Sequence, residues 1–402
     1  MLNIQGKYCK DCIVFTDNIE NDALSLLYTF LNHPAWQGQT IRIMPDVHLG
    51  MNIVIGFTGT YTDYVNPEHV GGDIGCSISS YITSFSLDPS KYALLEHRIR
   101  KQIKFGVDIQ EKKLYEDKEF YKFLNKQFSK YSNIVGTVNV DEKYITSFCK
   151  RIGLSETLFY KSIGSVGGGN HFVEIGLNAK NKLVSTVHCG SRSLGQHVCK
   201  YWTNVAKTEL PYNTYLTGDN LVGYLSDLIL SQAYAQFNHQ IIHQEIFNIL
   251  SVMCKVNNKP KFDSDAFIFT MHNYIDFANK IIHKGSIQAL NKNKVVIPFN
   301  MRDGLAICEG LSNEDWLNSA PHGCGRKLSR NKAKQLLDVD EFKNQMAGIV
   351  STSVSRSTID EAPDAYKAKD EIVDIIKDVT VDIIEFIKPV INCKSYTSED
   401  NG

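Results

Sequence analysis

The chain has 402 residues, with 43 lysines and arginines against 44 aspartates and glutamates, so its formal net charge is −1. This balance excludes a protein that binds nucleic acid mainly through a large positive charge, and any contact with RNA or DNA must be local. Hydrophobic residues make up 43% and charged residues 22% of the chain, which excludes a disordered or fibrous protein and predicts a buried core.

The first part of the chain alternates helical patterns with short apolar runs. Apolar side chains at helical spacing predict a helix from Ile19 to Leu31, and short strands are predicted at Thr40 to Ile43 and at Ile53 to Gly56. The pair Asp88-Pro89 predicts the start of a helix that continues to Ile103.

The second part contains the longest predicted helix, from about Leu221 to Met253. Three short apolar runs bounded by polar residues predict buried strands at 183–187, 267–271 and 295–298. Near the C-terminus, apolar and polar residues alternate over 379–383 until the pattern slips at Ile384, which predicts a strand with a β-bulge.

Strands and helices mix without a regular βαβ rhythm and without the Gly-x-Gly-x-x-Gly opening of a dinucleotide-binding fold. The expected fold class is therefore α/β, of mixed α+β character, with stacked β-sheets flanked by helices. No linker rich in Pro, Gly or Ser divides the chain, so we expect one domain over residues 1–402. Residues 1–12 contain no apolar signal region, and no stretch reaches the roughly 18 apolar residues of a membrane span, so we expect a cytoplasmic protein.

The ten cysteines are interpreted as thiols, because a large chain without an export signal rarely depends on disulfides. Cys9 and Cys12 form a Cys-x-x-Cys motif, but no second pair and no nearby histidine pair completes a tetrahedral zinc site. We therefore interpret this pair as incidental.

Five short segments combine glycine with His, Asp, Cys or Arg. They are Met-Pro-Asp-Val-His-Leu-Gly at 44–50, Gly-Gly-Asp-Ile-Gly-Cys at 71–76, Gly-Ser-Val-Gly-Gly-Gly-Asn-His-Phe-Val-Glu at 164–174, Val-His-Cys-Gly-Ser-Arg-Ser-Leu-Gly at 187–195, and Ala-Pro-His-Gly-Cys-Gly-Arg at 320–326. Glycine lets the backbone approach a phosphate or a metal closely, because it has no Cβ and tolerates positive φ.

These segments contain candidate metal ligands. Asp73 and Cys76 lie three residues apart, so one tight turn can present a carboxylate oxygen and a thiolate that is able to bridge two ions. His171, His188 and His272 can each supply a neutral imidazole nitrogen. Together they predict a centre with one or two metal ions. The alternative is that each histidine is a hydrogen-bonded interior residue, and spacing alone does not show that the five side chains converge.

Taken together, the five segments closely resemble the RtcB family of RNA-splicing ligases, from the Met-Pro-Asp-Val-His segment to Ala-Tyr-Lys at 365–367, which is nearly the whole chain. The resemblance implies a single large RtcB-like domain. It also implies that Asp73, Cys76, His171, His188 and His272 bind Mn²⁺, with the cysteine shared between two ions.

The resemblance further implies that His322 is the nucleophile that becomes guanylylated by GTP. Asn170 is then expected to contact phosphate, and Glu174 and Lys367 to read guanine. Arg192 and Arg326 are expected to engage phosphates of the RNA or the nucleotide, and a guanidinium suits this task because it donates two parallel hydrogen bonds. Two metal ions roughly 3.5–4 Å apart can stabilise the negative charge of phosphoryl transfer.

The implied activity is that of a GTP- and Mn²⁺-dependent RNA ligase. It would join a 3′-phosphate or 2′,3′-cyclic phosphate end to a 5′-hydroxyl end in tRNA splicing or RNA repair, with an archease-like activator among its expected partners. Two alternatives stay open: a metal-dependent phosphodiesterase or phosphatase acting on RNA ends, and a non-catalytic paralogue that binds RNA ends. A hydrolase would need neither His322 nor the guanine-reading pair. Zn²⁺ binds thiolate and imidazole more tightly than Mn²⁺ does, so the sequence leaves the metal open.

The chain departs from the family pattern at three places. Cys324 stands where most members have Ala, and Ser77 stands where most have Gly. The stretch 298–304, Pro-Phe-Asn-Met-Arg-Asp-Gly, replaces a Pro-Gly-Ser-Met-Gly form and bears on nucleotide preference.

Two histidine patterns outside the proposed ligand set also attract attention. His239 and His243 lie four apart on the longest predicted helix, but no glutamate follows His239 as the metalloprotease pattern requires, so we favour a structural or solvent-facing role. Asp46 and His48 are interpreted either as residues that orient metal-bound histidines or as parts of a structural turn.

Overall fold

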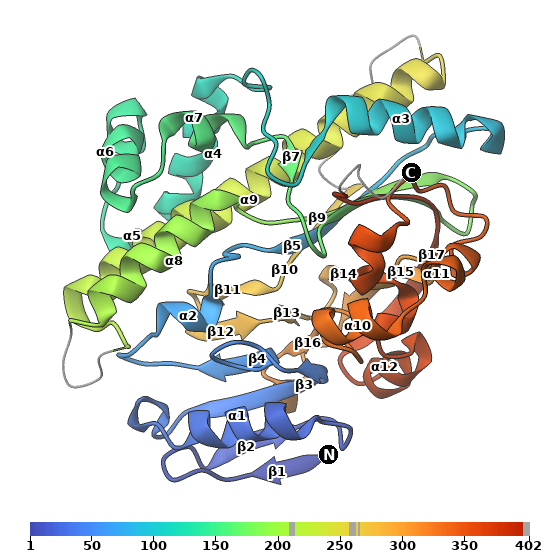
Figure 1. Ribbon diagram of the computed structural model, residues 1–402. Helices are drawn as coiled ribbons and strands as arrows, with labels where there is room; N and C mark the ends of the chain where they lie inside the picture. Colours follow the sequence, from blue (N-terminus) through green and yellow to red (C-terminus); the bar gives the residue numbers. More distant parts are fainter. Residues whose placement is uncertain (209–213, 257–262, 264–265, 397–402) are drawn as a thin grey trace.

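The computed structural model describes residues 1–208, 214–256, 263 and 266–396. One group of helices lies around the long helix α9 (Gly218–Met253), and a second group belongs to the C-terminal part of the chain (Figure 1). Of the two large sheets, one lies with helix α1 (Asn21–Leu31) at the end of the molecule that contains the N-terminus (Figure 1). The predicted mixture of helices with more than one sheet is confirmed. Within the described ranges, no helix combines the length and the apolar character needed to cross a membrane.

The six-stranded sheet lies at the N-terminal end of the molecule (Figure 1). Its order is β1 (Leu2–Ile4), β2 (Asp11–Val14), β3 (Thr40–His48), β4 (Ile55–Thr60), β12 (Ile281–Lys284) and β11 (Asn273–Asp276). The predicted strand at Thr40 extends further than expected, to His48, which brings the Met-Pro-Asp-Val-His motif into the sheet.

The seven-stranded sheet is the centre of the molecule. Its order is β10 (Phe267–Met271), β5 (Ser77–Ile82), β9 (Leu183–Cys189), β8 (Phe172–Leu177), β17 (Val381–Cys393), β15 (Gly304–Gly310) and β14 (Lys294–Asn300), and all neighbours are antiparallel. The two edge strands, β10 and β14, lie close to each other: the Val296 backbone N–H donates to Thr270 Oγ1 at 3.0 Å. The bulge predicted at Ile384 is confirmed, since Ile307 faces Glu385 while Cys308 faces Ile383.

Two short sheets connect these layers. One pairs β13 (Ser286–Gln288) with β16 (Ser319–Pro321), and the other pairs β6 (Lys104–Phe105) with β7 (Ser165–Val166). The β13–β16 pair holds the segment that contains the predicted nucleophile beside the larger sheets.

The helices cover the outside of the sheets. They are α1 (Asn21–Leu31), α2 (Pro67–Val70), α3 (Tyr92–Gln102), α4 (Asp117–Lys130), α5 (Ser132–Val135), α6 (Glu142–Ile152), α7 (Glu156–Lys161), α8 (Ser193–Ala206), α9 (Gly218–Met253), α10 (Arg330–Leu336), α11 (Val339–Gln345) and α12 (Lys369–Ile376). The helix predicted from Asp88 begins with a 3₁₀ turn, Pro89–Lys91, whose Ser90 N–H donates to the Asp88 side chain at 2.9 Å.

Helix α9 holds the central sheet in place. Its residues Ile242, Ile246 and Leu250 are buried together with Val173 and Val187 of the sheet, which is the apolar contact that removes this face from water. Beyond α9 lie α4, α6 and α7 (Figure 1).

Candidate active site

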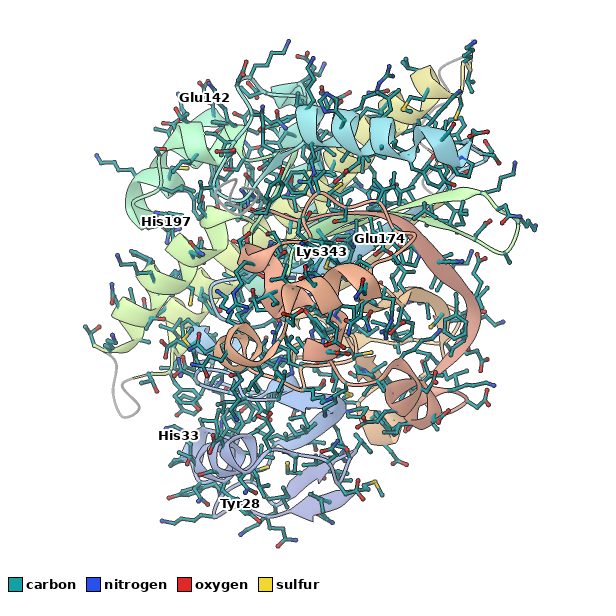
Figure 2. The ribbon with its side chains drawn as sticks, turned by 45° about the vertical axis from the view of Figure 1, so that its right-hand side comes forward. Tyr28, His33, Glu142, Glu174, His197 and Lys343 are labelled. Atoms are coloured by element: carbon teal, nitrogen blue, oxygen red, sulfur yellow. The ribbon has the colours of Figure 1, made fainter. Side chains whose placement is uncertain are left out.

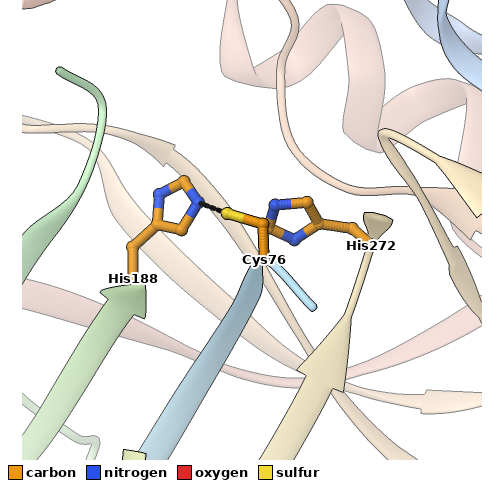
Figure 3. A group of neighbouring side chains, drawn as sticks. All are labelled: Cys76, His188 and His272. Carbon is orange, nitrogen blue, oxygen red and sulfur yellow. Dashed lines mark hydrogen bonds between the residues drawn. The ribbon is translucent and has the colours of Figure 1, made fainter. Parts of the chain in front are cut away.

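Four of the predicted metal ligands lie at the same end of four neighbouring strands in the central sheet. β10 ends just before His272 and β9 ends with His188-Cys189, while β5 begins just after Cys76 and β8 begins just after His171. Because neighbouring strands in the order β10-β5-β9-β8 run antiparallel, the end of β10 or β9 lies beside the beginning of β5 or β8, and the four residues lie together. Figure 3 shows Cys76, His188 and His272 meeting there.

The ligand atoms lie close enough to hold metal ions. Cys76 Sγ is 3.2 Å from His188 Nε2 and 3.3 Å from His171 Nε2, and His171 Nε2 is 3.1 Å from Asp73 Oδ2. The ligand atoms of Cys76, His188 and His272 all lie within 4.8 Å of one another, and so do those of Asp73, Cys76 and His171. The two groups share Cys76, so its sulfur belongs to both sets of potential metal ligands.

Two glycines make room for these side chains. A Cβ at Gly190 would lie 2.5 Å from Asp73 Oδ1, and a Cβ at Gly167 would lie 2.2 Å from His171 Nδ1. Neither distance is tolerable between non-bonded atoms, so only glycine fits at either position. The glycines of these motifs therefore give the ligands space.

The protonation of the ligands also suits a metal. Burial lowers the pKa of His188 and His272 well below the usual range, so both rings are neutral, and the buried Nδ1 of His272 has no hydrogen-bond partner among the described residues. Burial raises the pKa of Cys76, so its thiolate needs a neighbouring cation. Burial also tends to raise the pKa of Asp73, but nearby His171 brings it below the usual range. Neutral imidazoles, a carboxylate and a thiol fit a divalent transition metal.

His322 lies beside this centre, in the loop that follows β16. Its ring centroid is 5.0 Å from that of His272, and its Nδ1 is 2.6 Å from Oδ2 of the buried Asp46. A carboxylate offers only acceptors, so Nδ1 donates this hydrogen bond and the lone pair of Nε2 stays free. The His322 backbone N–H donates to the same oxygen at 3.2 Å. Asp46 thus orients His322, and the interpretation that it orients a metal-bound histidine was wrong in its target.

A cavity of about 660 Å³ adjoins the centre. Its walls include His188 and His322, together with Asn170, Glu174, Arg326 and Lys394. Glu174 is only 3% exposed, and burial raises its pKa to about 8 although Asn392 donates to its carboxylate at 2.9 Å. Figure 2 places Glu174 between the two ends of the molecule that carry Tyr28 and Glu142. The cavity therefore joins the candidate metal centre to a buried acidic group.

One wall of the cavity carries a local excess of positive charge. Glu361 accepts hydrogen bonds from Arg330 at 2.7 Å, Lys394 at 3.0 Å and Arg326 at 3.3 Å, and Arg330 also pairs with Asp360 at 2.6 Å. Burial would raise the pKa of Glu361, but Lys394 and the arginines lower it to about 2. Three cations thus face two carboxylates, which gives a nearly neutral chain a local attraction for phosphate.

Comparison with known proteins agrees with this geometry. Residues 30–395 match the family model described as tRNA-splicing ligase RtcB. The chain belongs to the RtcB family. It is 28% identical over 385 residues to the RNA-splicing ligase RtcB of Escherichia coli K12, covering 88% of this chain and 90% of that protein. It is 26% identical over 413 residues to the tRNA-splicing ligase RtcB of Nanoarchaeum equitans, covering 87% and 86% of the two chains.

Arg192 of this RtcB-family chain lies beside the candidate metal ligand His171 rather than on the cavity wall with Glu361. It precedes α8 with φ of 58°, and its guanidinium donates to the Gly106 carbonyl at 2.6 Å and to Ser165 Oγ at 3.1 Å. A Cβ at Gly167 would lie 2.8 Å from Arg192 Nη1 and 2.2 Å from His171 Nδ1, so the two side chains approach the same glycine. The structure thus brings Arg192 to His171 and Arg326 to the cavity wall.

Lys367, which was predicted to read guanine, is not among the residues that line the cavity. Its Nζ donates to the carbonyls of Pro45 at 3.0 Å, Val47 at 3.3 Å and Asn18 at 3.4 Å. Two other lysines, Lys332 and Lys394, line the cavity, and the sequence interpretation missed both. The only signal for Lys394 in the sequence is a lysine directly after the last strand.

The remaining predictions concern residues away from the cavity. His239 and His243 are buried and structural: Ser79 Oγ lies 2.6 Å from His239 Nδ1 and 2.7 Å from His243 Nε2, and Ser185 Oγ lies 2.8 Å from His243 Nδ1. Of the structural or solvent-facing role that we favoured, the structural part is confirmed and the solvent-facing part is wrong, because both side chains are 0% exposed. Among the described residues, neither cysteine of the Cys-x-x-Cys motif belongs to a group of three or more potential metal ligands.

Proposed function

We propose that this RtcB-family chain is an RNA ligase that uses GTP and two Mn²⁺ ions to join a 3′-phosphate or 2′,3′-cyclic phosphate end to a 5′-hydroxyl end. The observation that carries the proposal is the position of His322, whose free Nε2 lies between the candidate metal ligands and a cavity containing Glu174. A phosphatase or phosphodiesterase would need neither a guanylylated histidine nor a guanine-reading group such as Glu174, which disfavours the hydrolytic alternative.

The proposed reaction consists of a hydrolytic step, needed only for a cyclic phosphate, and three transfers. Water first opens a cyclic phosphate to a 3′-phosphate, where the substrate carries one. His322 Nε2 attacks the α-phosphorus of GTP, and pyrophosphate leaves as the N–P bond forms. The guanylyl group then passes from His322 to the RNA 3′-phosphate. Finally the 5′-hydroxyl oxygen of the partner strand attacks the phosphorus of the RNA 3′-phosphate and loses its proton to water. The phosphoanhydride bond to the guanylyl group breaks, and GMP leaves.

The chain's own groups have separate tasks in this scheme. Asp46 keeps the proton on Nδ1 of His322, so that Nε2 can attack. Arg326 and Asn170 line the cavity where phosphates would lie. Asp73, Cys76, His171, His188 and His272 would hold the metal ions. When bound, the ions would stabilise negative charge on phosphoryl oxygens.

The experiment incubates the purified chain with Mn²⁺, radiolabelled GTP and an RNA pair with 3′-phosphate and 5′-hydroxyl ends. We expect joined RNA, release of GMP and a covalently labelled protein. The variant His322→Ala should fold and bind metal as the wild type does, yet carry no label. Wild-type labelling of this variant would show that the nucleophile is misassigned. Loss of the RNA phosphate without joining would support the hydrolase instead.

Two further assignments belong to this proposal. The reaction would take place in the cytoplasm on tRNA halves or broken RNA, and an archease-like activator would promote it. Adding such an activator to the joining assay should raise the number of turnovers.

A further inference from the structure

Asn392 forms a buried pair with Glu174 on the cavity wall. The two residues lie directly opposite each other in the antiparallel strands β17 and β8, so their side chains share one face of the sheet. Asn392 Nδ2 donates to Glu174 Oε2 at 2.9 Å, and both residues line the cavity. They are 1% and 3% exposed, respectively.

This pair leaves two acceptor atoms without partners. Glu174 Oε1 and Asn392 Oδ1 are buried and accept no hydrogen bond from any described residue. Unpaired buried oxygens are costly, and they are uncommon in folded proteins except where a ligand completes them. The nearby amine of Lys394 is already engaged by Glu361 and by the Asn170 carbonyl. Because Glu174 and Asn392 both line the cavity, an occupant of the cavity can supply the missing donors.

We propose that Asn392 is a specificity-determining residue of the nucleotide pocket, acting with Glu174 as a pair of acceptors for a base edge that carries two neighbouring N–H donors. This inference rests on the proposed use of a guanine nucleotide. The Asn392 amide N–H fixes the carboxylate, and its Oδ1 supplies the second acceptor. Guanine offers the matching donors at N1 and at its 2-amino group. Hypoxanthine keeps only the first, and adenine presents an acceptor at N1.

The alternative is that Asn392 only holds Glu174 in position. Both roles predict weaker nucleotide binding when Asn392 is changed, so total affinity does not separate them. The ratio of affinities for GMP and IMP does separate them, because the two differ at the 2-amino group that Oδ1 would receive. A merely structural Asn392 would leave this ratio unchanged.

The experiment measures binding of GMP and IMP to the full chain by calorimetry, and labelling of the protein by GTP and ITP in parallel. The wild type should bind GMP roughly tenfold more tightly than IMP, as expected where a buried acceptor loses its donor. Asn392→Val should reduce this ratio to near one. The matched control Ile391→Val changes the neighbouring buried residue of the same strand and should preserve the ratio.

Two results would overturn the inference. One is a wild type that binds IMP as tightly as GMP, which needs no variant and so does not depend on whether Asn392→Val folds. The other is a folded Asn392→Val protein that keeps the wild-type ratio. Failure of the proposed function has a different signature: GMP binds with the expected preference, but GTP leaves no covalent label on His322.

Discussion

Replacing Asp46 by Asn tests whether the hydrogen bond to His322 sets up the nucleophile. The Asp46 carboxylate can only accept, whereas an asparagine amide can donate to Nδ1 and thereby favour the proton on Nε2, which blocks attack. The native contact is short, at 2.6 Å, and buried. A hydrogen bond to a charged group contributes about 1.5–3 kcal/mol, which corresponds to a decrease of roughly 10- to 150-fold in the rate of guanylylation.

The assay is single-turnover labelling of the Asp46→Asn protein over a range of GTP concentrations. We expect the maximal rate to fall while the half-saturating GTP concentration stays near the wild-type value, because Asp46 contacts His322 and is not on the cavity wall. Thermal unfolding and metal content serve as controls for folding. A folded variant that is labelled within twofold of the wild-type rate would refute the reasoning.

Three further predictions concern the surrounding groups. Burial raises the pKa of Glu174 to about 8, whereas guanine N–H donors favour the carboxylate form, so GMP binding should release a proton. The affinity for GMP, measured by calorimetry, should therefore rise as pH approaches 8, and Glu174→Gln should lose this rise. Cys76→Ser should weaken both metal positions in a metal analysis, whereas His272→Ala should weaken only one, because the two groups of ligands share Cys76 alone. Ser79→Ala should lower the free energy of unfolding by about 1–3 kcal/mol in urea titrations, because it leaves buried histidine nitrogens unpaired, while metal content stays unchanged.

Much of the fold could be predicted because its elements carry local signals. Alternation and apolar runs gave the strand at Phe267–Met271, and the slip of the pattern at Ile384 gave the bulge. The extension of β3 to His48 was missed, because Pro45 and Asp46 are residue types that strands rarely contain. The weak strand propensity of these residues is outweighed by contacts of the folded chain, such as the hydrogen bond between Asp46 and His322, which no local pattern predicts.

The candidate site was less accessible to sequence reasoning. Residue type and glycine spacing singled out the metal ligands, but their convergence depends on the order β10-β5-β9-β8, which no local pattern encodes. Lys367 and Lys394 illustrate the same limit on the nucleotide side. Both are lysines in the C-terminal part of the chain, but Lys367 donates to backbone carbonyls, whereas Lys394 lines the cavity. This difference depends on the folded backbone around each lysine and not on the residue type.

A second bulge in β17 explains how the cavity wall is built. Pro389 faces Gly176 and Ile391 faces Ile175, so Val390 is an extra residue without a partner in the ladder. Without that extra residue, the alternation of faces would set Ile391 opposite Glu174, and an apolar side chain would cover the carboxylate. The bulge advances the strand by one position, so that Asn392 faces Glu174. Because of this one extra residue, the cavity wall carries the oxygens of Asn392 and Glu174 side by side, where the unbulged strand would place the apolar side chain of Ile391.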